Sequence, residues 1–310
     1  MRHPQEPVLV TGIGGFIGRA TARRLAAAGQ PVVGMDVVAP GDAPCPVLVA
    51  DLREPHRLYE AILSHGIRAI VHTGGISGPM VARDSPTRIV GTNVEGTMHV
   101  FEAARLAGVR RVVWFSSVAA YGDQPDLEVV TETRALRPTN LYGASKVAGE
   151  AILRAYRAEY GLDGVALRPV SVYGPHRTTS CFVRALIENA RAGLPTRALA
   201  DPARRRQFVF VEDVVDAILA ALDADRVPEL AYNISAGVAY TTEEAAAIVA
   251  SVVPGARVEP DEAGAPWGTY RLGPLDVEAA RRDLGWRPAV DLAEGARRYA
   301  DWINRPARTP

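Results

Sequence analysis

The chain contains a single lysine, Lys146, which lies four residues after Tyr142. Every other member of the 35 Lys and Arg residues is an arginine, so this position is expected to need a compact, rotatable ammonium rather than a planar guanidinium. On a helix, residues four apart share a face, which brings the ammonium close to the phenol. A fixed positive charge favours the phenolate and lowers the pKa of a tyrosine from about 10 toward neutrality. The spacing predicts a general base or acid that works on an alcohol.

A pair of serines precedes that helix in the sequence. The β-rich run 110–115 predicts a strand, and Ser116 and Ser117 follow at its carboxyl end. This end of a strand is the edge at which open α/β sheets bind their ligands. The structural alternatives are a strand-end cap at Ser117 and a surface charge at Lys146.

The N-terminal part of the chain predicts a nucleotide-binding turn. An apolar run at 7–11 leads into the glycine cluster 12–18 and then into a helical pattern from 19 to 28. Such a unit lets a pyrophosphate approach the backbone and the positive end of the helix dipole. The next strand, 31–36, ends at Asp36, whose carboxylate can hydrogen-bond the adenosine ribose hydroxyls and repels a 2′-phosphate. We therefore expect NAD rather than NADP.

Two further strand ends extend the expected cofactor site. The run 47–50 leads into Asp51 and Leu52, which we expect beside the adenine. The run 68–72 leads into Thr73, Gly74 and Gly75, whose small size permits a close approach of the cofactor. The alternation of strands and helices predicts an α/β protein. Its expected core is a Rossmann-type doubly wound parallel sheet, followed by a smaller C-terminal α/β substrate-binding domain.

Together these segments resemble an extended short-chain dehydrogenase/reductase of the NAD-dependent epimerase/dehydratase family, whose best-known member is UDP-glucose 4-epimerase. The resemblance covers nearly the whole chain and rests on the order and spacing of its motifs. Those motifs are the glycine turn 12–18, Asp36, Asp51-Leu52, Asn93 within 91–97, Ser116-Ser117, Tyr142 to Lys146, and the runs 168–175, 206–214 and 283–288.

The resemblance implies a role for each catalytic candidate. Tyr142 would take the proton of the substrate hydroxyl as a hydride passes to the nicotinamide, or return it in the reverse step. Ser117 would hydrogen-bond the same oxygen, and Lys146 would bind the nicotinamide ribose as well as lower the pKa of the tyrosine. Two donors on one oxygen stabilise an alkoxide where it forms.

The resemblance also implies two sets of binding residues. NAD would be bound by Gly12, Gly14, Gly15, Phe16, Ile17, Gly18, Asp36, Asp51, Leu52, Thr73, Gly74, Gly75, Asn93, Ser116, Tyr142, Lys146, Pro169 and Val170. The substrate would contact Ser77, Ser117, Ser171, His176, Arg177, Arg206 and Arg271. The arginines Arg206 and Arg271 fall about where the family holds a diphosphate, and arginine suits such bidentate contacts.

The residues after Ser117 narrow the expected reaction. In the family's sugar 4,6-dehydratases an acidic pair stands there, whereas this chain has Val118 and Ala119, which cannot move protons. The favoured function is therefore C4 epimerisation of a nucleotide sugar through a transient keto intermediate. A dehydrogenase of a free sugar acid or small hydroxy acid stays open, because Ser171 replaces the family's usual asparagine and the segment 74–77 is similar to uronate dehydrogenases. A non-catalytic NAD-sensing protein is a third alternative.

Composition excludes several classes of function. The 35 acidic and 35 basic residues balance, so neither nucleic acid nor an anionic membrane is an expected partner. Two cysteines give no disulfide framework and favour a reducing, cytoplasmic location, and no apolar stretch is long enough to span a bilayer. The six histidines are scattered without metal-ligand spacing, so no metal is expected, and His72 is expected to be a packed residue.

The expected organisation has two domains. Residues 1–174, with 207–222 returning to them, would form the NAD-binding domain, and 175–206 with 223–310 would form mainly the substrate-binding domain. The stretch 207–211 is expected to be a strand that rejoins the main sheet. Two amphipathic stretches, 87–107 and 139–160, flank the serine strand. In the family such helices pair with the same helices of a second copy in a four-helix bundle, so a homodimer is expected.

Overall fold

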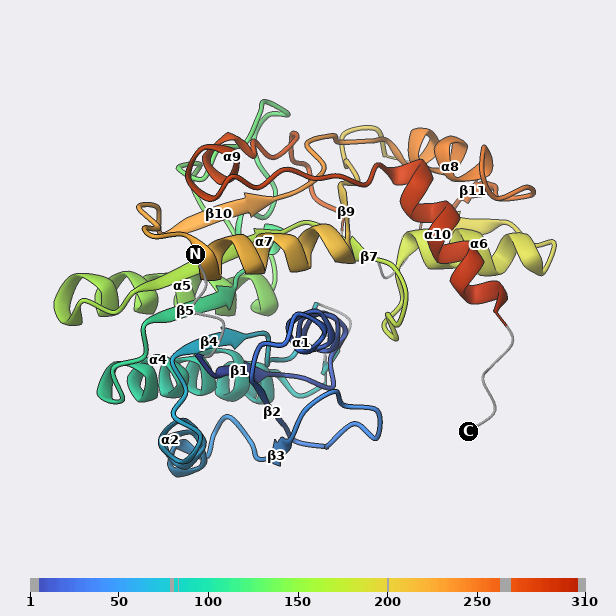
Figure 1. The fold of residues 1–310 in the computed structure, drawn as a ribbon. Coiled ribbons are helices and arrows are strands. Elements are labelled where there is room, and N and C mark those ends of the chain that lie inside the picture. The colour runs from blue at the N-terminus through green and yellow to red at the C-terminus, as the bar shows by residue number, and fades with distance from the viewer. Residues whose placement is uncertain (1–5, 79–80, 83, 200, 263–268, 306–310) are drawn as a thin grey trace.

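The computed structural model describes residues 6–78, 81–82, 84–199, 201–262 and 269–305, and its central element is a parallel sheet (Figure 1). Within these residues, seven strands lie in the order β10-β6-β5-β4-β1-β2-β3, and each neighbouring pair is parallel. The predicted doubly wound sheet is confirmed. Its strands are β1 (Val8–Thr11), β2 (Val32–Asp36), β3 (Val47–Val49), β4 (Ala69–His72), β5 (Arg111–Phe115), β6 (Gly164–Pro169) and β10 (Ala231–Ile234).

Helices cover both faces of this sheet (Figure 1). Val8 and Val10 of β1 belong to the core on one face, and Leu9 belongs to the core on the other. Because both faces are covered, the strands are apolar along their length rather than alternating. One face carries α1 (Phe16–Ala27), α7 (Val211–Asp223) and α9 (Glu278–Leu284), and the other carries α2 (Pro55–Ser64), α4 (Gly96–Leu106) and α5 (Leu141–Tyr160).

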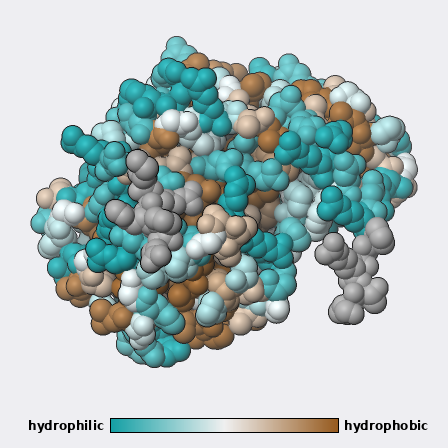
Figure 2. Space-filling view, viewed as in Figure 1, coloured by the Kyte–Doolittle hydropathy of each residue, from teal (hydrophilic) through white to brown (hydrophobic). Residues whose placement is uncertain are grey.

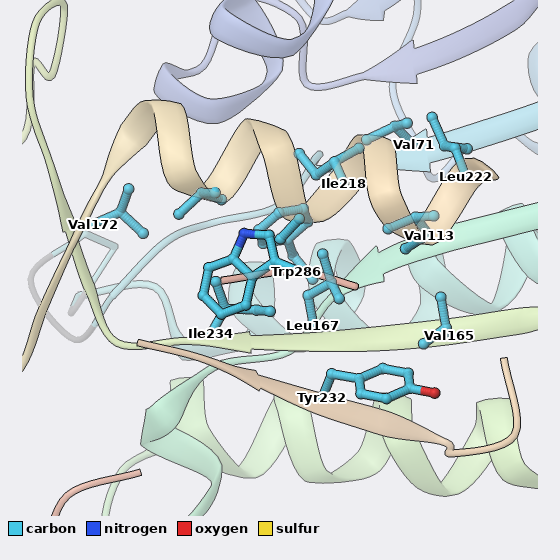
Figure 3. Close-up of a cluster of buried hydrophobic side chains, with 14 of the residues drawn as sticks. Val71, Val113, Val165, Leu167, Val172, Ile218, Leu222, Tyr232, Ile234 and Trp286 are labelled. Carbon is cyan, nitrogen blue, oxygen red and sulfur yellow. The ribbon is translucent and has the colours of Figure 1, made fainter. Parts of the chain in front are cut away.

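A buried tryptophan closes the first of these two cores (Figure 3). Trp286, which follows α9, lies near Leu167 of β6 and Ile234 of β10, beneath α7. Its indole N–H donates to the carbonyl of Asp213 at 2.9 Å. The Asp213 carboxylate in turn accepts the backbone N–H groups of residues 289 and 290 at 2.9 and 3.1 Å. These bonds fasten the C-terminal segment to α7.

The smaller part of the molecule is built around two short pairs of strands. β7 (Ser171–Tyr173) pairs with β9 (Phe208–Phe210), and β8 (Thr196–Ala198) pairs with β11 (Val258–Pro260). The helices α6 (Phe182–Arg191), α8 (Thr242–Ala250) and α10 (Leu292–Asn304) surround them, at the right of Figure 1. Their buried side chains form a third core.

The expectation that residues 207–211 rejoin the main sheet is wrong. β9 pairs with β7 outside that sheet, and β10 takes the edge position beside β6. In the sequence Asn233 interrupts the apolar run of β10. The structure accommodates the buried amide because it donates to the carbonyls of Val130 and Asp276 at 3.0 Å each. A polar side chain with partners can occupy a buried strand.

The stretch expected as one helix over 87–107 contains a wider turn. α3 (Pro86–Val90) leads into a π-helical turn (Gly91–Glu95) and then into α4. Single π-helical turns inside helices are frequent at functional sites. This one carries Asn93, whose side chain is buried.

Among the described residues, none of the helices combines the length and the apolar character that a membrane crossing needs. On the face shown in Figure 2, hydrophilic and hydrophobic residues are interspersed. Hydrophobic residues reach this face at several places, among them its lower part and its upper right.

Candidate active site

A cavity of about 350 Å³ lies at the carboxyl ends of the central strands, between the sheet and the smaller part of the molecule. The strand order changes direction between β4 and β1, and doubly wound sheets bind their ligands at such a switch point. Most of the predicted site residues line this cavity. They are Gly15, Phe16, Ile17, Gly18, Thr73, Gly75, Ser77, Ser116, Ser117, Tyr142, Lys146, Pro169, Val170, Ser171, Arg177 and Arg206.

The glycine turn is packed too tightly to carry side chains at its centre. A Cβ at Gly18 would collide with the carbonyl of Gly12 and lie 2.7 Å from the hydroxyl of Thr73. Gly12 itself has a φ of 70°, and its N–H donates to the carbonyl of Met35 at 2.7 Å. α1 begins directly after Gly15, and no side chain of the described residues caps it. Its free N–H groups fit a pyrophosphate.

Asp36 ends β2 with its carboxylate turned toward this turn. One oxygen accepts the N–H of Gly14 at 2.8 Å, and the other accepts the N–H of Val37 at 2.7 Å. A carboxylate has about four lone-pair sites, so each oxygen keeps one for a ribose hydroxyl. Asp36 and Gly14 lie beyond the lining of the cavity, on the side where the adenosine of NAD is expected.

Asp51 and Leu52 also lie outside the lining and have structural partners. Asp51 pairs with Arg53 at 2.7 Å, and this hydrogen bond holds the pKa of the carboxyl below its usual value. Leu52 packs against Gly74 and Gly96. Leu52 therefore supports the loop that follows β4, whereas Asp51 stabilises its own turn through Arg53.

The predicted packed position of His72 agrees with its surroundings. Its ring lies between the hydroxyls of Thr11, 2.7 Å from Nδ1, and Thr97, 3.1 Å from Nε2. Burial and the nearby Lys146 lower the pKa of the ring to about 3. His72 is therefore neutral at physiological pH and carries no charge into the site.

Asn93 holds a loop rather than lining the cavity. Its amide oxygen accepts the N–H of Ile76 at 2.8 Å, and its amide nitrogen donates to the carbonyl of Ile76 at 3.0 Å. The same nitrogen donates to the hydroxyl of Ser145 at 3.2 Å. The π-helical turn thus ties α5 to the loop that carries Gly75 and Ser77.

Ser117, Tyr142 and Lys146 all line the cavity. Ser117 follows β5 and accepts the N–H of Ala119 at 3.1 Å, so it is a strand-end cap as well as a lining residue. Its hydroxyl is also within hydrogen-bonding reach of Tyr142. The ammonium of Lys146 donates to the carbonyl of Phe115 at 2.7 Å and lies 5.6 Å from the centre of the Tyr142 ring.

The sequence predicted that Lys146 lowers the pKa of Tyr142, but in the structure this pKa is raised. Burial raises the pKa of Tyr142, and the hydrogen bond to Ser117 opposes that rise only in part. Burial is the largest cause of the shift, and the ammonium of Lys146 is bonded to the carbonyl of Phe115, 5.6 Å from the centre of the tyrosine ring. Burial also lowers the pKa of Lys146 to about 8, against the charge of Glu150.

Two residues behind this group escaped the sequence reasoning. Glu150 and Arg168 form an ion pair at 2.5 Å, with each side chain 4% exposed. Ser116 donates to Glu150 at 2.5 Å, so this predicted cofactor residue also has a structural partner. The sequence could have indicated Glu150, because it follows Lys146 by four residues, as Lys146 follows Tyr142, and this spacing places all three on one helix face.

Arg206 is the clearest polar group on the substrate side of the cavity. It is 5% exposed, its guanidinium lies 4.1 Å from the ring centre of Phe182, and its Nε donates to Thr242 at 2.9 Å. No carboxylate of the described residues pairs with it at salt-bridge distance. Burial lowers its pKa to about 10, so it keeps its charge at neutral pH.

His176 lies outside the cavity, contrary to the expectation that it contacts the substrate. Its φ of 70° turns the chain, and its ring contacts Trp302 in a tilted arrangement, with 5.0 Å between ring centres and 58° between ring planes. Its Nε2 lies 3.2 Å from a guanidinium nitrogen of Arg23 in α1. His176 therefore joins α10 to α1 across the surface.

The two other predicted arginines differ from Arg206. Arg177 lines the cavity, but its guanidinium donates to the carbonyl of Val172 in β7 and to the carbonyls of residues 179 and 180 in its own loop. Arg271 is exposed, and it is its chain neighbours Tyr270 and Leu272 that line the cavity. Tyr270 lies in a segment without regular helix or strand, and the sequence pattern could not show which of its residues face the cavity.

No metal centre is found in the part of the chain that the structure describes. None of its His, Cys, Asp and Glu side chains form a group of three or more that could hold an ion. Cys45 and Cys181 are both free.

These features define a class of protein: a Rossmann fold with a tight glycine turn after its first strand and with a serine, a tyrosine and a lysine lining one cavity at the carboxyl ends of the strands. The chain belongs to the NAD dependent epimerase/dehydratase family, whose sequence profile matches residues 8–235. It is therefore an NAD-dependent enzyme of the epimerase/dehydrogenase type.

Individual relatives match over almost their full length. A UDP-glucose 4-epimerase of Mycolicibacterium smegmatis is 33% identical over 97% of this chain and 99% of its own. The solved UDP-glucose 4-epimerase of Thermus thermophilus, a complex with NAD, is 31% identical with a TM-score of 0.84 and covers 96% of this chain and 98% of its own. MoeE5 in complex with UDP-glucuronic acid and NAD is 29% identical with a TM-score of 0.85, at the same coverage.

Proposed function

We propose that this enzyme interconverts nucleotide sugars that differ at C4, through a transient 4-keto intermediate. The observation that carries the proposal is that one cavity holds both groups suited to oxidising a hydroxyl and a cation suited to binding a diphosphate. Ser117 and Tyr142 suit the oxidation of a sugar hydroxyl, and the buried cation of Arg206 suits a diphosphate. The relatives named as UDP-glucose 4-epimerases support the same substrate class.

The residues that would hold NAD are spread along the sheet edge. The turn 12–18 and the N-terminus of α1 would hold the pyrophosphate, and Asp36 would hold the adenosine ribose. Lys146 would hold the ribose of the nicotinamide. Bound NAD supplies the hydride acceptor and a cationic ring, which is the positive charge that a phenolate at Tyr142 needs.

Tyr142 and Ser117 would act on one substrate oxygen. Tyr142 removes the hydroxyl proton while the hydride leaves the same carbon, and Ser117 donates to the oxygen as it becomes a carbonyl. Rotation of the keto sugar in the cavity presents its other face. Return of the hydride to that face, with the proton from Tyr142, gives the epimer.

Dehydration is disfavoured by the residues beside Ser117. Val118 and Ala119 both line the cavity, and neither can transfer a proton. An elimination step needs an acid and a base near the substrate, beyond the group that oxidises the alcohol.

A dehydrogenase acting on a free sugar acid or small hydroxy acid is the second candidate. Ser171 is exposed at the cavity, at the position where the family usually has an asparagine that contacts the nucleotide sugar. Such an enzyme would release NADH after each turnover, whereas an epimerase returns the hydride.

Absorbance at 340 nm separates these two functions. Purified protein with excess NAD would be given UDP-hexoses in one reaction and free uronic and aldonic acids in another, and the products would be analysed. Conversion of a UDP-hexose to its C4 epimer without net NADH is the expected result. Steady formation of NADH with the free acids, and no epimerisation, would overturn the proposal.

We further propose that the enzyme is a cytoplasmic homodimer. Exposed apolar side chains on α4 and α5, including Leu106 and Tyr160, support a helix-mediated interface, and two free cysteines support a reducing compartment. The division into an NAD-binding and a substrate-binding domain is likewise a proposal, supported by the separate core around α6, α8 and α10. Light scattering at increasing protein concentration tests the dimer.

A further inference from the structure

We infer that Glu150, held by Arg168, is a positioning residue that fixes the end of β5 against α5 and keeps Lys146 an ammonium. The inference rests on the proposed roles of Ser117, Tyr142 and Lys146. It adds a residue that does not touch substrate and acts through two that line the cavity.

Helix α5 presents three side chains to the site at intervals of four residues. Tyr142, Lys146 and Glu150 share one face of the helix. The last two hold adjacent groups at the end of β5: Lys146 donates to the carbonyl of Phe115 at 2.7 Å, and Glu150 accepts from Ser116 at 2.5 Å. Ser117, the proposed partner of the substrate oxygen, is the next residue, so its position follows from these bonds.

The helix can approach β5 this closely because Gly149 has no side chain. A Cβ at Gly149 would lie 2.5 Å from the indole ring of Trp114. The ammonium of Lys146 lies 5.2 Å from the centre of the same ring. Glycine thus brings the helix into contact with the strand, and the two polar contacts set its register.

Arg168 of β6 fixes the carboxylate of Glu150 from the other side. Its Nε and Nη2 donate to the two carboxylate oxygens at 2.7 and 2.5 Å, a bidentate arrangement. Its Nη1 donates to the hydroxyl of Tyr121 at 2.7 Å, and that hydroxyl donates to Asn233 of β10 at 2.8 Å. The network therefore joins α5 to three strands of the sheet.

A buried ion pair of this kind is not explained by stability alone. Removing two charges from water costs several kcal/mol for each ion, and an apolar pair of similar volume is often as stable. Both side chains of the pair are 4% exposed. An apolar pair could not orient the hydroxyl groups of Ser116 and Tyr121, which Glu150 and Arg168 hold by hydrogen bonds.

The charged and titratable groups around Lys146 single out Glu150. From α5 the neighbours are Tyr142 and Glu150, from β4 the neighbour is His72, and Arg168 of β6 lies behind Glu150. His72 is neutral, since its pKa is lowered to about 3. Burial lowers the pKa of Lys146 to about 8, and Glu150 is the group that opposes this lowering.

The single lysine of the chain makes a direct test possible. Protein grown with lysine labelled with ¹³C at Cε gives one lysine signal, and its shift with pH reports the pKa of Lys146 without an assignment and without substrate. In Glu150→Gln we expect this pKa to fall by about one unit or more, because an opposite charge nearby favours the ammonium. Glu159→Gln, an exposed position on the same helix, is the matched control and should leave the signal unchanged.

A double variant separates the charge of Glu150 from damage caused by an unpaired Arg168. Glu150→Met with Arg168→Met removes both charges and retains volume. The proposal expects the pKa of Lys146 to fall here too. A pKa equal to that of the natural protein in this variant, or in Glu150→Gln, would overturn the inference.

Activity provides the second readout. In Glu150→Gln, kcat should fall about fivefold or more at pH 8 with KM changed less than about threefold. The ratio to the natural enzyme should recover toward pH 6, where Lys146 is protonated in both. A uniform loss at all pH values would indicate a structural role only and would overturn the inference. If Tyr142→Phe kept full activity, the proposed function would fail, yet the shift of the lysine signal would still stand.

Discussion

The two sides of the cavity are built in different ways. On the cofactor side, chain segments that directly follow neighbouring parallel strands are joined largely through the backbone: Gly12 bonds to the carbonyl of Met35, and the Thr73 hydroxyl bonds to the carbonyl of Thr11 at 2.7 Å. On the substrate side, segments 171–183, 205–208 and 270–272 come together from distant parts of the chain. There the main polar group, Arg206, is directed by its packing on an aromatic ring.

This difference teaches where local rules suffice. A strand that must be buried and a turn that must be tight place a cofactor residue to within a short segment. A substrate residue is placed by packing between segments that no local rule connects. Substitutions on the cofactor side should therefore cause large losses of NAD affinity. Substitutions on the substrate side should cause smaller, graded changes in KM.

The largest effect is expected at Tyr142, where the two sides meet. Tyr142→Phe removes the hydroxyl that we propose transfers the proton, and it keeps the ring over which Lys146 lies. Turnover should fall about 10²- to 10⁴-fold, which is the usual contribution of general acid–base catalysis, while NAD affinity should stay within about threefold. Single-turnover measurements with UDP-hexose check this. Tyr160→Phe, at the exposed end of the same helix, should behave as the natural enzyme, and equal losses in both variants would contradict the assignment.

The extent of sequence-based prediction follows the same division. The parallel sheet, the turn 12–18 and Asp36 could be predicted, because burial on both faces and the need for a tight turn leave marks in the residue types. The position of β10 could not, since Asn233 breaks the apolar run and is satisfied only by partners far away in the chain.

The charge state of the catalytic group was predicted only in part. The spacing of Tyr142 and Lys146 correctly placed them on one helix face, but it could not show that the carbonyl of Phe115 binds the ammonium. Nor could it show how deeply both groups are buried, and burial decides the direction of both pKa shifts. Residue type gives the possible chemistry, and the dielectric surroundings come from tertiary packing.

The next largest effect is expected on the cofactor side. Gly18→Ala adds a Cβ that collides with the carbonyl of Gly12, so the turn must open and the N-terminus of α1 must shift. We expect NAD affinity to fall about 100-fold or more, measured by titration calorimetry, because the pyrophosphate contacts depend on this geometry. Gly41→Ala is the matched control, since a Cβ there meets nothing within 4 Å. Unchanged binding in Gly18→Ala would show that the turn is not the pyrophosphate site.

A graded effect is expected at Arg206 on the substrate side. Arg206→Gln removes a charge-assisted contact to a diphosphate, which corresponds to about 1.5–3 kcal/mol or roughly a 10- to 100-fold rise in KM for a nucleotide sugar. The value of kcat should change little, because the contact is the same in the ground state and the transition state. Arg271→Gln, an exposed position whose side chain is not among the lining groups, should leave KM within about threefold. Equal effects of the two substitutions would remove the support for a diphosphate at Arg206.

The smallest effect is expected at His176. It tests whether the family's sequence pattern correctly predicts the residues that contact the substrate. The resemblance places this residue in the substrate pocket, whereas the structure places its ring between Trp302 and Arg23. His176→Ala should therefore leave KM and kcat within about threefold and lower the midpoint of thermal unfolding by a few degrees, because an exposed ring contact contributes about 1 kcal/mol. A tenfold rise in KM with no change in that midpoint would return His176 to the substrate pocket. The loop that carries His176 would then have to move when the substrate binds, so the substrate side of the cavity would not be rigid.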